Sequence, residues 1–484
     1  MAINRISGAV SMSGHAVGVT RHQQGLTSMR AYVALATRLL LVLVLSAGEF
    51  GCVGYRPANA RLEHWQPEYG YRARDSATRP FGETLVILAF SGGGTRASAL
   101  SYGILQELRD TTIVVDGESR RLLDEVDLIT SVSGGSFTSA YFALFGDRIF
   151  EDFEERVLRK NLQRGLIVDL LKPWNWVRMM IPGFDRSELA VRRYDREIFD
   201  GATFADLVDA PGPFIEINAA DLGVGNRFTF VQTQFDPMCS DLSQLEVARA
   251  VTASSAVPVA FSPITLKNYA GSCGFERPAW LNEALADRRG SRRRFWDALI
   301  AETYLDSDQR AYIHLVDGGI ADNLGLRGPL DMTRLEGGIT ERFATMGVEA
   351  PRRLVTIVVD AEVHPPPAFN QSPKSPSLGA IVGSVSGVQL YRYNFETLEL
   401  MQSTLDGWAA ELSRTHGRPV SAHFIEVAFQ ALEDPEERAY FNEVPTSLQL
   451  DDEMVDRLIA VGRRLLTESR EYQTLLEELA ADGN

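Results

Sequence analysis

The sequence contains few side chains that bind metals. Of its 484 residues only three are cysteine and seven are histidine, and no His, Cys and Asp residues cluster at the spacing of metal ligands. We therefore expect chemistry that needs no metal and no cofactor. The sequence also lacks the G-x-x-x-x-G-K-[ST] pattern of nucleotide-binding phosphate loops, and it shows no internal repeat or low-complexity block.

Positive charge is scarce as well. The chain has 48 Lys and Arg against 64 Asp and Glu, a formal net charge of -16. This acidic balance argues against nucleic acid as a partner. It also implies that any contact with a membrane surface depends on apolar residues or on an anchor rather than on overall charge.

Residues 1–52 are expected to form a signal peptide. Residues 39–45 are an unbroken aliphatic run, preceded by two arginines. The run is too short to span a membrane comfortably, but its length suits the core of a signal peptide. We therefore expect export to a bacterial cell envelope, either periplasmic or membrane-anchored. An uncleaved anchor is the alternative, and translation starts at either Met1 or Met29.

Cys52 is a candidate for lipidation. Gly51-Cys52 follows the aliphatic run and resembles the end of a bacterial lipobox, in which the cysteine is acylated after cleavage. Glu49 departs from that pattern, because an aliphatic residue usually stands there.

The other two cysteines are Cys239 and Cys273. In an oxidising compartment they can form a disulfide, which the polar, loop-like sequence around both favours. Two buried free thiols are the alternative.

The remaining chain divides into three parts. Residues 53–80 lack apolar periodicity and are expected to be an extended lead-in. Residues 81–365 alternate aliphatic strands with helical patterns and are expected to form the main domain. Residues 366–484 begin with a proline- and serine-rich loop and end in a charged helical stretch, and we expect this extension to pack on the main domain. Oligomeric state is not predicted by the sequence.

Four aliphatic segments have the length and composition of buried strands: 86–90, 126–130, 311–316 and 353–360. Alternation of such strands with helices predicts an α/β fold, a three-layer α/β/α sandwich with a mostly parallel central sheet. Binding and catalytic sites in these sheets lie at the carboxyl ends of the strands.

Three of these strands end in chemically distinctive residues. The first runs into the turn Gly92-Gly93-Gly94, followed by Thr95-Arg96 and a helical pattern. Such a turn points backbone N–H groups and the positive end of a helix at an anion, although phosphate cradles and plain tight turns share this pattern. The second strand leads to Ser133 and the third to Asp317. In a parallel sheet these ends share one edge, so we expect them to converge.

Ser133 has the surroundings of a nucleophile. Gly135 two positions later matches one arm of the G-x-S-x-G elbow, a strained turn that exposes the serine hydroxyl. Ser131 occupies the leading position, where the motif has glycine, and it is small enough to be tolerated. Ser136 is the poorer candidate because no glycine stands two positions after it.

A serine nucleophile needs a base within hydrogen-bonding reach. None of the seven histidines has a motif around it, and His314, inside a strand, is expected to be a packed core residue. Aspartate can replace histidine in a two-residue arrangement, and Asp317-Gly318-Gly319 is the candidate. Alone, Asp317-Gly318 also reads as an ordinary turn.

The glycine turn, the Ser133 elbow and Asp317-Gly318-Gly319 together resemble, in that order, the signatures of the patatin-like phospholipases. The resemblance includes residues 218–222 and 253–258 and implies that 81–365 is a patatin-like catalytic domain. It implies a lipid acyl hydrolase (phospholipase, lysophospholipase or esterase) in which Ser133 attacks the ester and Asp317 accepts its proton. The amides of Gly92, Gly93 and Gly94 would hold the oxyanion, and Arg96 would orient the loop or meet a lipid phosphate.

Two other functions use the same residues. Acyl transfer to an acceptor other than water needs the same site, and a surface lipid-binding protein without catalysis is a third possibility. Residues 170–182, rich in Trp, Met and Pro, are either core or a face that touches lipid.

Overall fold

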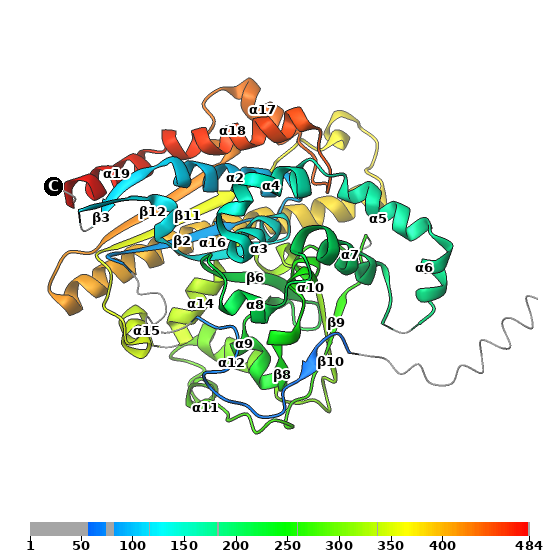
Figure 1. Ribbon diagram of the computed structural model, residues 1–484, viewed down its shortest axis with the longest axis horizontal. Coiled ribbons are helices and arrows are strands. Elements are labelled where there is room, and N and C mark those ends of the chain that lie inside the picture. Colours follow the sequence, from blue (N-terminus) through cyan, green and yellow to red (C-terminus); the bar gives the residue numbers. More distant parts are fainter. Residues whose placement is uncertain are drawn as a thin grey trace, which may run out of the picture. The chain divides into compact units, whose positions relative to one another are not determined.

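The aliphatic segments of the sequence form one central sheet. The computed structural model describes residues 57–73, 82–115, 117–181, 183–258, 260–335 and 337–482. The expected signal peptide and Cys52 lie outside these ranges. Within them, eight strands form a sheet in the order β12-β11-β2-β5-β6-β10-β9, and β7 pairs with β6 (Figure 1). The strands are β2 (Thr84–Phe90), β5 (Val126–Val132), β6 (Phe214–Asp221), β7 (Asn226–Thr229), β9 (Ile264–Lys267), β10 (Tyr312–Asp317), β11 (Arg353–Asp360) and β12 (Ser421–Ala428).

Helices cover both faces of the sheet because side chains along each strand alternate in direction. From β2, Val86, Leu88 and Phe90 enter one apolar core, whereas Leu85 and Ala89 contact a second. The first core includes α2 (Thr95–Asp110), α3 (Gly134–Phe145) and α18 (Asp452–Glu468). The second includes α14 (Arg327–Leu335), α15 (Ile339–Met346) and α16 (Leu378–His416). The predicted α/β fold with helices on both faces of the sheet is confirmed.

The strand that ends at Asp317 runs opposite to expectation. Strands β12, β11, β2, β5 and β6 are parallel, but β10 is antiparallel to β6. The expectation that Asp317 reaches the site at the end of a parallel strand is therefore wrong. The register of β10 explains how Asp317 still reaches the site. Asp317 pairs with Ala219, and Val132 pairs with the preceding residue of β6, Asn218. Strand β10 begins beyond the carboxyl end of β6 and runs back along it, so that its last residue, Asp317, lies level with the residue after Val132.

The C-terminal residues complete the sheet and one helical layer. Strand β12 pairs with β11 over the full length of both strands. Helix α18 packs along α2, and α19 (Arg470–Asp482) contacts β12. The boundary expected at residue 365 thus falls between two neighbouring strands of the same sheet.

The N-terminal described segment attaches beside a disulfide. Strand β1 (Ala60–Arg61) pairs with β8 (Ser240–Asp241). Cys239 and Cys273 form a disulfide, and both are buried against Leu62. Their surroundings are therefore more apolar than the flanking sequence indicates.

Candidate active site

Ser133 occupies a strained turn between β5 and α3. Its backbone has φ 50° and ψ -117°, an unusual conformation for a residue with a side chain. The turn needs Gly135, because a Cβ atom there would lie 2.7 Å from both Cβ and the carbonyl oxygen of Phe90. Ser131 fits in place of the motif glycine, since its buried hydroxyl accepts a hydrogen bond from Ser139 at 2.7 Å. The local geometry is that of a nucleophile elbow.

The hydroxyl of Ser133 donates a hydrogen bond to Asp317. The distance from Oγ to Oδ2 is 2.9 Å, and the other carboxylate oxygen accepts the backbone N–H of Gly319 at 2.9 Å. Burial raises the pKa of Asp317 to about 6, and the bonds from Gly319 and Ser133 partly oppose that rise. A carboxylate with a raised pKa is a better proton acceptor at neutral pH than an exposed aspartate.

Ser254, at the end of α10 (Val247–Ser254), fixes both members of this pair. Its hydroxyl accepts the backbone N–H of Ser133 at 2.8 Å and donates to the carbonyl of Asn218 at 2.6 Å. The carbonyl of Ser254 accepts the backbone N–H of Gly318. The backbone N–H of Asp317 donates to the carbonyl of Ala256, two residues after Ser254. The family resemblance included residues 253–258 but gave no role to Ser254, because a small buried serine has no distinctive signature.

Ser136 belongs to the same support and not to the nucleophile position. Its hydroxyl is buried and lies 3.0 Å from that of Ser254. His314, by contrast, is exposed and its Nδ1 lies 3.0 Å from Thr265 Oγ1, so the expectation of a packed core histidine is wrong. Antiparallel pairing of β10 with β9 leaves alternate residues of β10 on an exposed face.

The glycine turn lies directly against the Ser133 turn. A Cβ atom at Gly134 would lie 2.1 Å from the carbonyl oxygen of Gly94, so the two loops touch. The amide of Gly92 is already engaged, because it donates to the carbonyl of Asn323 at 3.0 Å. For the amides of Gly93 and Gly94 we find no hydrogen-bond partner among the described residues. These two are the donors that remain for an oxyanion.

Arg96 is buried behind the glycine turn, with 3% of its surface exposed. Its guanidinium donates to the carbonyls of Ala361 at 2.8 Å and Val444 at 2.6 Å, and to the hydroxyl of Thr446 at 3.0 Å. Burial lowers the pKa of Arg96 to about 10, a change that nearby carboxylates such as Asp360 oppose. Of the two roles open from the sequence, this geometry matches a brace for the loop.

The C-terminal part of the chain therefore supports the loops of the candidate site. Besides Val444 and Thr446, the carbonyl of Ser447 accepts the N–H of Thr95 at 2.8 Å and caps the start of α2. No sequence signal marked residues 444–447, since backbone carbonyls can come from any residue type.

The described residues contain no group of three or more His, Cys, Asp or Glu side chains arranged to hold a metal ion.

Comparison with known proteins gives one family match. A family model described as patatin-like phospholipase matches residues 88–330. No curated protein sequence matches the chain. Among solved structures, human GIVD cytosolic phospholipase A2 is similar, with a TM-score of 0.41, 11% identity and coverage of 90% of this chain and 69% of that one. VipD from Legionella pneumophila has a TM-score of 0.30, 13% identity and coverage of 89% and 72%. The family match spans half of the chain and contains Ser133 and Asp317.

Replacing Arg96 tests whether it braces the loop. We expect Arg96→Ala to lower activity on a phospholipid and on a neutral ester by the same factor, because the loop loses three hydrogen bonds whatever the substrate. The free energy of unfolding should also fall, by about 3 kcal/mol or more. Initial rates on the two substrates and chemical denaturation measure these effects. Loss on the phospholipid alone would show a phosphate contact instead.

Proposed function

Because the chain belongs to the patatin-like phospholipase family, we propose that it is a lipid acyl hydrolase that works through a Ser133–Asp317 dyad. The observation that carries the proposal is the 2.9 Å hydrogen bond from the strained Ser133 to the buried Asp317. A pair with this geometry has a nucleophile and a base in contact before substrate binds.

The reaction has two halves. Ser133 Oγ forms a bond to the ester carbonyl carbon while its proton passes to Asp317 Oδ2. The oxyanion that develops is held by the amides of Gly93 and Gly94, already fixed in place. Collapse breaks the bond to the alcohol, which takes the proton from Asp317 and leaves an acyl-Ser133. Water then attacks the acyl group, with Asp317 again accepting a proton, and the fatty acid departs as Ser133 is restored.

The rim of the site is suited to an apolar substrate. Leu222 follows β6, Val257 lies three residues after the end of α10 and Ile320 lies three residues after Asp317, and about half of each residue's surface is exposed (58%, 46% and 56%). Exposed aliphatic residues close in sequence to the residues of the site favour lipid over a polar ester.

We further propose that α5 (Leu162–Leu171) and α6 (Pro173–Arg178) contact the membrane surface. These helices project from the sheet (Figure 1), and with the turn that follows α6 they carry some of the most exposed apolar side chains of the described chain, with Trp174 of α6 at 78% and Met180 of the turn at 85% exposed. Leu171, Trp176 and Val177 add to this surface. Of the two roles open for residues 170–182, this exposure supports lipid contact. No described helix has the length and apolar character to span a bilayer.

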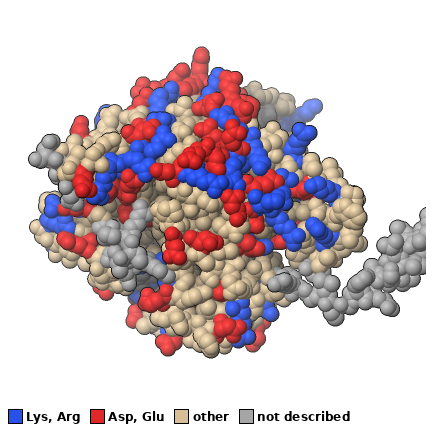
Figure 2. Space-filling view, viewed as in Figure 1, with Lys and Arg blue, Asp and Glu red and all other residues tan. Residues whose placement is uncertain are grey.

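The local charge around α5 and α6 supports the same membrane contact. Between residues 159 and 193 there are eight Lys and Arg against three Asp and Glu, the reverse of the whole-chain balance. Lys and Arg side chains gather beside the largely uncharged surface of α5 and α6 (Figure 2). Anionic lipid head groups attract such a basic border.

Ion pairs connect α5, through α7, to the helix that supports Ser133. Asp169 of α5 pairs with Arg193 of α7 (Arg186–Tyr194) at 2.6 Å, and Glu188 of α7 pairs with Arg249 of α10 at 2.8 Å. Helix α10 in turn carries Ser254.

We also propose export to the bacterial cell envelope, with Cys52 as the lipidated residue. The Cys239–Cys273 disulfide supports this, because disulfides persist in oxidising compartments. Mass spectrometry of the mature N-terminus distinguishes acylated Cys52 from an uncleaved segment.

Removing either dyad member should abolish hydrolysis. We expect Ser133→Ala and Asp317→Asn each to lower kcat by about 10,000-fold, because the nucleophile or its base is lost. Both proteins should keep their circular dichroism spectra. A fluorophosphonate probe should label Ser133 in the native chain and not in Ser133→Ala. Retention of more than a small fraction of activity by pure Ser133→Ala would contradict the mechanism.

The pH dependence gives a second readout of the same mechanism. Asp317 must be ionised to accept the proton, so kcat/KM should fall as the pH drops below about 6. A pH-rate profile on a dispersed ester measures this. A profile flat between pH 5 and 8 would contradict the role of Asp317 as base.

Polar substitutions on α6 and in the turn that follows it test the membrane contact. A fully buried apolar side chain of this size contributes about 1.5–3 kcal/mol. Trp174→Ser with Met180→Ser should therefore weaken vesicle binding and hydrolysis at least about tenfold. Hydrolysis of a dispersed short-chain ester should not change. Trp296→Ser is the matched control, since Trp296 is 59% exposed on another helix. An equal loss in the control would contradict the proposal.

A further inference from the structure

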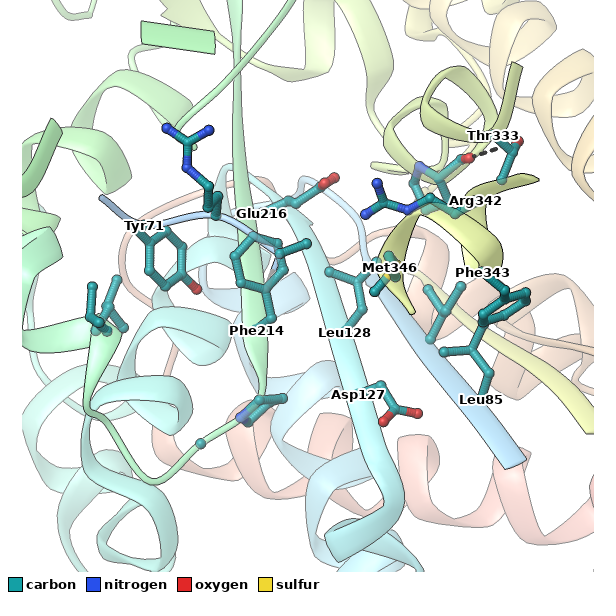
Figure 3. A pocket seen from close by; sticks show the side chains of 18 of the residues that line it. Tyr71, Leu85, Asp127, Leu128, Phe214, Glu216, Thr333, Arg342, Phe343 and Met346 are labelled. Atoms are coloured by element: carbon teal, nitrogen blue, oxygen red, sulfur yellow. Dashed lines mark hydrogen bonds between the residues drawn. The ribbon is translucent and has the colours of Figure 1, made fainter. Parts of the chain in front are cut away.

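A cavity of about 400 Å³ lies at the opposite end of the sheet from Ser133. The first residues of β2, β5 and β6 line it, including Leu85, Leu128 and Phe214 (Figure 3). Leu128 precedes Ser133 by five residues in β5, which at a rise of about 3.3 Å per residue separates the two by roughly 16 Å. Neither Ser133 nor Asp317 lines the cavity. It is therefore separate from the candidate active site.

The walls of the cavity are mostly apolar. Helix α15 contributes Phe343 and Met346, which face Leu85 and Leu128 across the space (Figure 3). Trp408 of α16 also lines it. The volume lies within the range of roughly 300–1,000 Å³ typical of small-molecule sites. These walls fit a hydrocarbon chain.

One buried glutamate in the cavity wall has a carboxylate oxygen without a hydrogen-bond partner among the described residues. Glu216 of β6 is only 3% exposed, and within the described residues its Oε2 has no hydrogen-bond partner. A buried polar atom without a partner costs free energy, which a ligand at this position would offset. Glu216 and Arg342 point toward one another at the same end of the cavity (Figure 3).

Together these two side chains can recognise an anion. Burial raises the pKa of Glu216, which favours the neutral carboxyl group, while nearby Arg227 and Arg342 oppose that rise. A neutral carboxyl donates an O–H hydrogen bond to a carboxylate, and the guanidinium of Arg342 supplies positive charge.

We propose that this cavity binds a single-chain aliphatic carboxylate, with its chain between the sheet and α15 and its head group at Glu216 and Arg342. A fatty acid is also the product of the proposed hydrolysis, so the cavity would be a product-binding site remote from the dyad. The role as a product-binding site rests on the proposed function, whereas the binding of an aliphatic carboxylate does not depend on it.

Calorimetric titration with dodecanoate tests the proposal. The protein is first treated with a long-chain alkyl fluorophosphonate, so that ligand binding at Ser133 is blocked. We expect one dodecanoate site per chain to remain. Dodecyltrimethylammonium, which has the same chain and the opposite charge, should bind at least about tenfold more weakly. Absence of a remaining dodecanoate site, or equal binding of the two amphiphiles, would overturn the proposal.

Paired variants locate the site. Met346→Trp fills the cavity and should weaken dodecanoate binding at least about tenfold. Thr345→Trp adds the same side chain on the exposed side of α15 and should leave binding unchanged. Equal affinity of the two variants would overturn the assignment. Both positions lie far from Ser133, so a failure of the proposed hydrolysis would leave this comparison intact.

The head group is tested separately at Glu216. Glu216→Gln retains a donor and should keep binding, whereas Glu216→Leu should lose it. The thermal unfolding of Glu216→Leu is measured alongside, so that its binding is compared only with that of a folded protein. This pair decides the question if Met346→Trp does not fold. Unchanged binding by Glu216→Leu would overturn the proposed head-group contact.

Discussion

The site depends on strand register at β5, β6 and β10. Val132 pairs with Asn218, and Asp317 pairs with Ala219 one residue further along β6. Ser133 therefore stands level with Asp317 across one intervening strand, at a hydrogen-bonding distance of 2.9 Å. A shift of one residue in either pairing would turn the side chains to the other face of the sheet. The geometry of the dyad is thus a property of the sheet and not of either turn alone.

Burial shapes the chemistry around this register. Asp317 has a raised pKa because it lies away from water, and each of its carboxylate oxygens accepts one hydrogen bond, from Gly319 and from Ser133. Arg96 is charged and buried, and three acceptors from residues 361–446 satisfy it. All three partners of Arg96 are distant in sequence, whereas Asp317 has one distant partner, Ser133, and one close partner, Gly319. Glu216, in the wall of the cavity, differs, since one of its oxygens has no partner among the described residues.

Apolar side chains of the described chain lie in two settings, the buried cores and the exposed surface of α6. Alternation along β2 places its side chains in two cores, one on each face of the sheet. Helix α6, in contrast, leaves Trp174 and Val177 exposed although its backbone is anchored through Asn175, whose amide donates to the carbonyl of Asp169 at 2.7 Å. This exposure is the observation behind the proposed membrane contact.

The sequence by itself determined four of the eight strands of the sheet, the two turns and the residue types of the dyad. Aliphatic runs and glycines carry these features locally, because strand burial and positive φ depend on neighbours in the chain. The tertiary structure decided the rest. Strand direction at β10 depends on pairing with β6, which no local pattern encodes. The supports of the loops, from Ser254 to the carbonyl of Val444, are contacts between distant residues, and many of them use backbone atoms common to every residue type. The exposure of α6 and the isolation of Glu216 likewise follow from what the fold places beside them.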